Sequence, residues 1–197
     1  MQDKRRHQRI RFRSPPPIRI GYGGVVGQGS IENLSLSGLM LRTEMKLDVG
    51  HRAGCEFSLF GSPMIDLPAI VVNRMGDLIG LRMESGPISQ ILISDAIAAA
   101  LAEGHACVLT MHETEAGKIM RIAGGLNGTL QTDVMYSLTR VGVDEIDVSE
   151  VTAVDRAGLA LCLLAQGRYG VRIGRQSDCF SAAWREIFQT PGAKGIQ

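Results

Sequence analysis

The pattern of the chain changes near Glu103-Gly104-His105, and this change is the strongest constraint on what it can fold into. Before it, short β-rich runs are separated by glycine and proline, and after it, strand-like and helix-like runs alternate. The chain has 197 residues, of which 45% are hydrophobic and 21% charged, and this composition is typical of folded domains. We therefore predict an α+β protein with two domains at residues 1–102 and 106–190, a linker at 103–105 and a tail at 191–197.

The first half is predicted to be an antiparallel β-barrel with a closing helix. Six runs have strand-forming composition and are bounded by turn residues. They are residues 18–22, 25–34, 38–41, 55–60, 68–73 and 78–83. From residue 88 to residue 102, apolar residues recur at helical spacing, so a single helix is expected to pack against the sheet. The glycine run at residues 21–29 fits a hairpin, because it lacks both G-x-G-x-x-G spacing and a following helix.

The second half is predicted to be an α/β domain with a mostly open sheet and flanking helices. The strand-like runs are residues 107–112, 119–123, 145–148 and 171–173. The helix-like runs are residues 131–139, 155–166 and 181–188. Asp155 is a favourable residue for the N-cap of the middle helix.

Positive charge is concentrated at the start of the chain. The first twenty residues contain seven Lys or Arg and one Asp, although the net charge of the whole chain is only +1. Residues 1–17 are predicted to be a basic, mobile arm that ends at three consecutive prolines, with the fold beginning after it. Such an arm favours an anionic partner: a nucleotide, a nucleic acid or a membrane surface.

Several classes of protein are disfavoured. The four cysteines form no C-x-x-C pair and no signal-peptide core follows the start, so a reducing cytoplasm is expected. The most apolar stretch, residues 88–101, is shorter than the roughly 20 apolar residues of a membrane span. His105, Cys107 and His112 have no fourth ligand at a recognised spacing, so no metal is expected. No nucleophile, base and orienting acid form a known motif, so we predict that the protein is not an enzyme and needs no cofactor.

Two short motifs in the first half give the most specific indication of function. Arg5-x-x-x-Arg9 precedes Asn33-x-Ser35-x-x-Gly38, and the second motif lies just before a strand. The pair R-x-x-x-R and [D/N]-x-S-x-x-G, in this order, resembles the ligand signature of PilZ domains over residues 1–102. The resemblance implies that the chain binds cyclic di-GMP through Arg5, Arg6, Arg9, Asn33, Ser35 and Gly38.

The chemistry of these side chains suits that ligand. Guanidinium groups bind phosphates and the O6 and N7 acceptors of guanine with paired hydrogen bonds, as expected for Arg5 and Arg9. Asn33 and Ser35 lie two apart on a strand, so they share a face and can offer short polar groups to a guanine. Gly38 would allow a turn and the close approach of the ligand. Each motif also has a simpler explanation, because basic arms are often solvated and Asn-x-Ser is common in turns.

The second half resembles a STAS domain, the fold of anti-sigma-factor antagonists, over about residues 106–190. The resemblance is centred on the strand-loop-helix sequence of residues 145–159, with support from Ile122-Ala123-Gly124-Gly125-Leu126 and from the later Val171-Arg172-Ile173. It implies docking of a protein partner. Regulated members carry a phosphorylatable Ser or Thr after the Asp, but here Arg156 follows Asp155, so no phosphate switch is expected at that position.

The sequence thus predicts a cyclic di-GMP receptor or adaptor whose second domain docks a signalling partner that the sequence does not identify. Two alternatives remain. One is a nucleic-acid-binding regulator that uses the basic arm, although aromatic residues make up only 5% of the chain, too few to favour base stacking. The other is a degenerate PilZ scaffold that binds no nucleotide.

Overall fold

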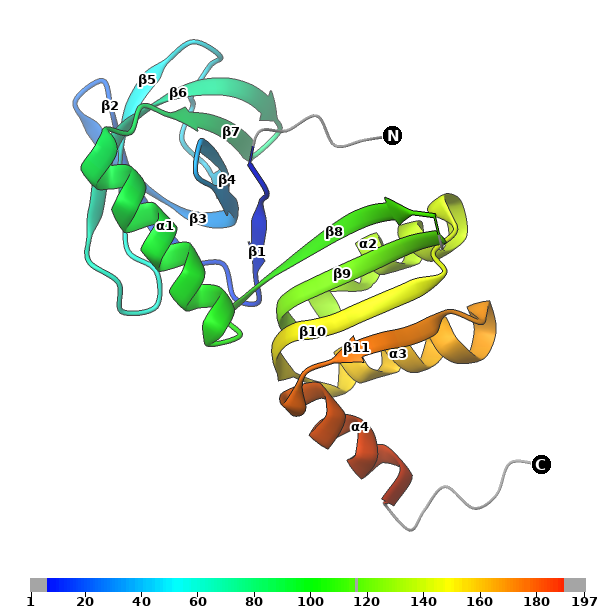
Figure 1. Ribbon diagram of the computed structural model, residues 1–197. Coiled ribbons are helices and arrows are strands. Elements are labelled where there is room, and N and C mark those ends of the chain that lie inside the picture. The colour runs from blue at the N-terminus through cyan, green and yellow to red at the C-terminus, as the bar shows by residue number, and fades with distance from the viewer. Residues whose placement is uncertain (1–6, 116, 190–197) are drawn as a thin grey trace. The chain divides into compact units, whose positions relative to one another are not determined.

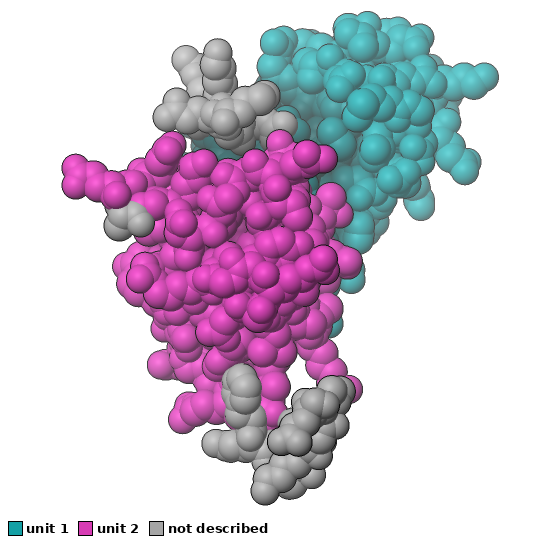
Figure 2. Space-filling model, turned by 90° about the vertical axis from the view of Figure 1, so that its right-hand side faces the viewer, with its two compact units in different colours: residues 1–100 teal, residues 101–197 magenta. Residues whose placement is uncertain are grey.

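The chain divides into two compact units, residues 1–100 and 101–197. The computed structural model describes residues 7–115 and 117–189. Figure 2 shows the two units in different colours. Their division falls inside helix α1 (Pro87–Ala102), near the end of the first predicted domain.

The first unit contains a closed six-stranded antiparallel barrel, as predicted. Its strands are β2 (Pro17–Tyr22), β3 (Val25–Ser35), β4 (Gly38–Thr43), β5 (Arg52–Phe57), β6 (Ile65–Met75) and β7 (Leu78–Met83). They are ordered β3-β2-β5-β6-β7-β4, and β4 pairs back with β3 to close the barrel. Closure leaves no unpaired strand edge within this ring.

Alternation of side chains explains how the barrel is filled. In β6 the alternate residues Ile65, Leu67, Ala69 and Val71 are buried, so one face of the strand lines the core. Helix α1 runs alongside the barrel (Figure 1) and buries Ile93 together with two alanines. The predicted hairpin within the glycine run is present between β2 and β3.

The prediction that all of residues 1–17 lie outside the folded barrel is wrong. Strand β1 (Ile10–Phe12) pairs antiparallel with β3. Ile10 and Phe12 are 2% and 3% exposed, and the Phe12 ring lies 5.9 Å from that of Phe60. The alternation of these two apolar residues with arginines was obscured by the charge of the segment. Residues 1–6 of the predicted arm lie outside the described residues.

The predicted strand at residues 55–60 was placed three residues too late. The chain turns at Leu59, where the Ser62 amide donates to the Leu59 carbonyl at 2.8 Å. Phe60 has a φ of 44°, in the left-handed region, which is incompatible with a strand. Of the two apolar residues in this turn, Leu59 is buried and Phe60 is exposed, so neither needs a strand to account for it.

The second unit is a four-stranded sheet with helices. Its strands are β8 (Ala106–Thr114), β9 (Gly117–Leu126), β10 (Glu145–Val154) and β11 (Arg172–Gln176). Its helices are η1 (Gly128–Leu130), α2 (Gln131–Tyr136), η2 (Ser137–Val141), α3 (Arg156–Tyr169) and α4 (Asp178–Gln189). The single helix predicted at residues 131–139 is thus divided, because its last turn is a π-helix that ends at Gly142 with a positive φ.

Among the described residues of the second unit, no helix covers one face of this sheet. β8 and β9 form an antiparallel hairpin, and β10 and β11 then add in order, each parallel to its predecessor. Because two successive crossovers step across the sheet in one direction, their helices lie on the same side. Figure 1 shows α2 and α3 behind the sheet. Among the described residues of the chain, no helix is long and apolar enough to cross a membrane.

Candidate functional site

Strand β1, which directly follows Arg9, pairs with the strand that carries the second predicted motif. In its pairing with β3, Ile10 lies opposite Leu34 and Arg11 lies opposite Asn33. Continued by one residue, this register places Arg9 opposite Ser35. Arg9 is half-buried. Arg5 and Arg6 lie outside the described residues. Of the two arginines in the first motif, the structure therefore describes only Arg9.

Asn33 carries a buried polar atom without a partner. Its Oδ1 atom is buried and accepts no hydrogen bond. Among the described residues, no other buried side-chain nitrogen or oxygen lacks a partner. A buried acceptor left unpaired costs about 1–3 kcal/mol. Such an atom is expected where a donor arrives from outside the chain. A donor from outside the chain, such as a water molecule or an N–H group of a ligand, would complete this contact.

Ser35 and Gly38 have structural roles in the barrel. The Ser35 hydroxyl donates to the Gly38 carbonyl at 3.0 Å and closes the tight turn between β3 and β4. A Cβ atom on Gly38 would lie 2.3 Å from the carbonyl oxygen of Leu81 on β7. The close approach that requires glycine here is therefore the approach of a neighbouring strand. The turn and the strand packing therefore account for the Ser-x-x-Gly spacing, and no ligand is needed to explain it.

A groove of about 560 Å³ lies next to both motifs. Its lining includes His7, two residues before Arg9, and the turn residue Ser37, two residues after Ser35. The end of β7 and the first turns of α1 from Pro87 complete it. The groove is therefore lined by residues that are close in sequence to Arg9 and Ser35.

In the second unit, the start of α3 has the predicted cap. Asp155 is the N-cap, and its carboxylate accepts from the amide of Gly158 at 2.9 Å. A Cβ atom on Gly158 would lie 2.2 Å from the carbonyl oxygen of Leu126, so glycine lets the helix approach the end of β9. Arg156 is exposed at the first position of the helix.

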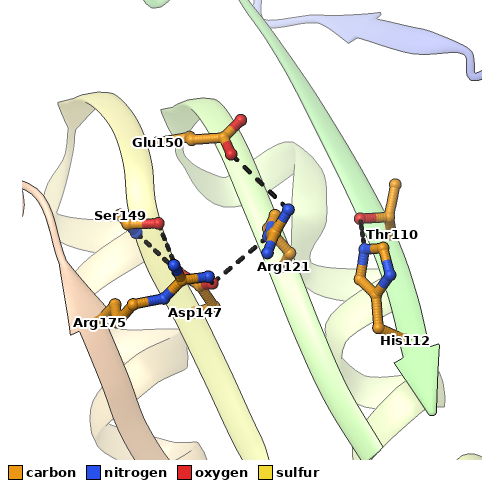
Figure 3. A network of polar contacts seen from close by, with 7 residues as sticks. All are labelled: Thr110, His112, Arg121, Asp147, Ser149, Glu150 and Arg175. Atoms are coloured by element: carbon orange, nitrogen blue, oxygen red, sulfur yellow. Dashed lines mark hydrogen bonds and ion pairs between the residues drawn. The ribbon is translucent and has the colours of Figure 1, made fainter. Parts of the chain in front are cut away.

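A polar network that was not predicted from the sequence lies on the sheet of the second unit (Figure 3). Asp147 on β10 is 1% exposed and accepts from the Ser149 amide at 3.0 Å and the Ser149 hydroxyl at 2.6 Å. Its other oxygen accepts from Arg121 on β9 at 3.3 Å and from Arg175 on β11 at 2.5 Å. One sequence pattern could have indicated this network. Glu145 and Asp147 alternate with buried apolar residues, which places both acids on the face without helices.

The environment of Asp147 keeps its carboxylate ionised. Burial by itself raises the pKa of Asp147, but hydrogen bonds from Ser149 and the charge of Arg175 outweigh it and lower the pKa from 3.8 to about 2. The acid is therefore charged at any physiological pH. Its network joins β9, β10 and β11 at one point.

The thiols and histidines do not form a metal-binding group among the described residues. No cluster of three His, Cys, Asp or Glu side chains there has the arrangement of a metal site. Burial raises the pKa of the Cys55 and Cys162 thiols to about 12, so these thiols stay protonated. His112 instead contacts the hydroxyl of Thr110 at 3.1 Å.

Comparison with protein families decides the identity of the first unit. Residues 3–99 match the family model described as PilZ domain. The first unit is a PilZ domain. This PilZ domain has the barrel that the sequence predicted. The match ends at residue 99, so it makes no statement about the second unit. The comparison with curated proteins finds no match.

Solved structures similar to the chain include two complexes with cyclic di-GMP. The PilZ domain of YcgR from Escherichia coli with c-di-GMP is 17% identical, over 49% of this chain and 91% of that chain, with a TM-score of 0.44. The MrkH-c-di-GMP complex from K. pneumonia is 18% identical, over 51% of this chain and 53% of that chain, with a TM-score of 0.43. The Bacillus subtilis inhibitor of motility, MotI/DgrA, is 15% identical, over 51% of this chain and 53% of that chain, with a TM-score of 0.42. Because these values are low, the assignment rests on the family model.

Proposed function

We propose that the PilZ domain of this protein is a receptor for cyclic di-GMP. The observation that carries the proposal is the unpartnered, buried Oδ1 atom of Asn33, beside the strand that follows Arg9. A guanine offers N–H donors that can complete this acceptor, and the guanidinium of Arg9 suits a phosphate or the O6 and N7 atoms of a guanine. Arg5 and Arg6 are proposed to supply further cationic contacts.

The receptor role needs no chemistry on the ligand. Binding is proposed to use Arg5, Arg6, Arg9 and Asn33, with Ser35 and Gly38 shaping the β3–β4 turn that borders the groove. The protein then acts as a non-enzymatic sensor in the cytoplasm. Its output depends on a difference in ligand affinity between two arrangements of the chain, because a ligand shifts an equilibrium only by that difference.

The second unit is proposed to be a STAS-like module that docks a protein partner. An antiparallel hairpin followed by two parallel crossovers, with the capping Asp155 before α3, supports this assignment. Arg156 stands where regulated members carry a hydroxyl, so docking is proposed to respond to the nucleotide rather than to phosphorylation at this position.

Isothermal titration calorimetry of the full chain tests the receptor role. Cyclic di-GMP is expected to bind saturably, whereas GTP and a short oligonucleotide are not. Asn33→Ala should weaken binding about tenfold, the scale of one lost buried hydrogen bond, whereas Asn73→Ala, on the exposed part of β6, should leave it unchanged. Binding of the oligonucleotide alone would indicate a nucleic-acid regulator, and a flat titration with all three would indicate a scaffold; either result would overturn the proposal.

A further inference from the structure

Charges on the open face of the second unit are arranged in two layers. The side chains of Asp147 and Glu145 on β10 are only 2% and 16% exposed. Their partners on β11, Arg175 and Arg172, are 68% and 72% exposed. The carboxylates therefore lie against the sheet, and the guanidinium groups lie above them. The solvent-exposed groups along β11 are therefore positively charged, although each ion pair has no net charge.

Local sequence explains how this layering forms. Ile146 and Val148 are buried on the helix side of β10, so Glu145 and Asp147 project from the other face. A Cβ atom on Gly174 would lie 2.1 Å from Oε1 of Glu145. Glycine at this position therefore lets Glu145 lie across β11. From there, its Oε2 atom accepts a hydrogen bond from Nε of Arg172 at 3.0 Å.

The buried carboxylate of Asp147 positions arginines and has no capacity left for a ligand. Each of its two oxygens accepts two hydrogen bonds, from Ser149 and from the two arginines Arg121 and Arg175. Arg175 uses one of its five N–H donors in this contact, and the described part of the chain offers the others no partner. Donors of an arginine held at one end are pre-organised for a second anion.

We propose that this face of β10 and β11 docks an acidic segment of a partner protein, with Arg172 and Arg175 as the anchors. The inference deepens the docking role proposed for the second unit and rests on it. Charge complementarity is the argument, since the exposed layer is cationic and its arginines are held by acids below. Figure 3 shows the Arg175 side chain in front of the sheet, with the helices behind.

The same surface is poorly suited to nucleic acid. Glu150, 59% exposed, lies 3.8 Å from Arg121 within the network and would repel a continuous chain of phosphates. The described strands β8 to β11 contain no Phe, Tyr or Trp on which bases could stack. A peptide can place carboxylates at the arginines and neutral residues near Glu150.

Fluorescence anisotropy of a labelled oligoglutamate peptide with the full chain tests the proposal. Binding is expected at low salt and should weaken as salt rises. Arg172→Glu with Arg175→Glu should raise the dissociation constant at least about tenfold. The matched control, Arg140→Glu with Arg168→Glu, makes the same charge change on η2 and α3 and should stay within about twofold. Equal effects of the two pairs would overturn the proposal.

Amide chemical shifts locate the bound peptide. Oligoglutamate should shift amides of β10 and β11, and shifts confined to other elements would overturn the docking site. Tighter binding of an oligothymidine through the same arginines would overturn the assignment to a protein partner. If the Glu pair unfolds the unit, Arg172→Gln with Arg175→Gln carries the same expectation. Calorimetry with cyclic di-GMP on the same variants separates the two proposals, because the receptor role predicts unchanged nucleotide binding in all of them.

Discussion

Replacing Asp147 with Asn should destabilise the second unit by about 2 kcal/mol or more. The pKa of Asp147 is lowered from 3.8 to about 2, and each unit corresponds to about 1.4 kcal/mol of preference for the charged form in the folded state. Asn removes that charge. Its amide group also places N–H donors against those of Ser149 or Arg175, which leaves at least one buried donor unpaired.

The effect should depend on pH in a defined direction. Because the folded pKa is the lower one, the stability from the Asp147 carboxylate is present above about pH 4 and is lost as the pH falls toward 2. Asn does not titrate. The difference in unfolding free energy between parent and variant should therefore shrink by about 1 kcal/mol between about pH 6 and about pH 3.

A single tryptophan makes the measurement specific to this unit. Trp184 on α4 is the one tryptophan of the chain, and its ring lies 5.3 Å from that of the buried Phe180. Urea unfolding followed by tryptophan fluorescence therefore reports the second unit alone. Glu113→Gln, an exposed change on β8, is the control and should cost less than about 0.5 kcal/mol. Two results would refute the reasoning. One is a loss of unfolding free energy for Asp147→Asn as small as that for Glu113→Gln, and the other is a difference in unfolding free energy between parent and Asp147→Asn that does not change with pH.

Three further predictions concern close packing and thiols. Gly38→Ala should destabilise the barrel by about 2 kcal/mol or more, measured by native-state hydrogen exchange of the barrel amides, because its Cβ would lie 2.3 Å from Leu81 O; unchanged exchange protection would contradict this. Gly158→Ala should cost the second unit a similar amount by Trp184 fluorescence, because its Cβ would lie 2.2 Å from Leu126 O, and an effect as small as that of an exposed substitution would contradict it. In a titration with an aromatic disulfide reagent, only the exposed Cys179 should react in the folded chain, and rapid reaction of the three buried cysteines would count against their burial.

The barrel was predictable because its strands alternate and its turns are marked by glycine. The strand predicted at residues 78–83 matches β7, and the run at residues 25–34 lies within β3. Segment ends were harder to predict. β10 continues to Val154, although the polar residues Ser149 and Glu150 suggested an end at Val148. A strand with one solvated face tolerates such residues, because only alternate positions need to be apolar.

The candidate site was predictable as a motif but not as an arrangement. Sequence placed Asn33 in the ligand set, yet its unpaired oxygen follows from the packing around β3. Similarly, alternation along β10 places Asp147 on the open face, but its contacts with Arg121 and Arg175, far from it in the sequence, follow from the pairing of the strands. Contacts between strands depend on register, and a local pattern does not specify register between distant segments.

Because β1 belongs to the barrel, the basic arm is not a detachable tail. A chain shortened to begin at Pro17 would lose Ile10 and Phe12, which are 2% and 3% exposed, and the loss of a buried side chain of this size typically costs about 2–5 kcal/mol. Failure of such a shortened chain to bind a nucleotide would have two causes that truncation cannot separate, namely the missing arginines and the weakened barrel. Point substitutions such as Arg9→Ala separate them, because they leave both apolar side chains in place.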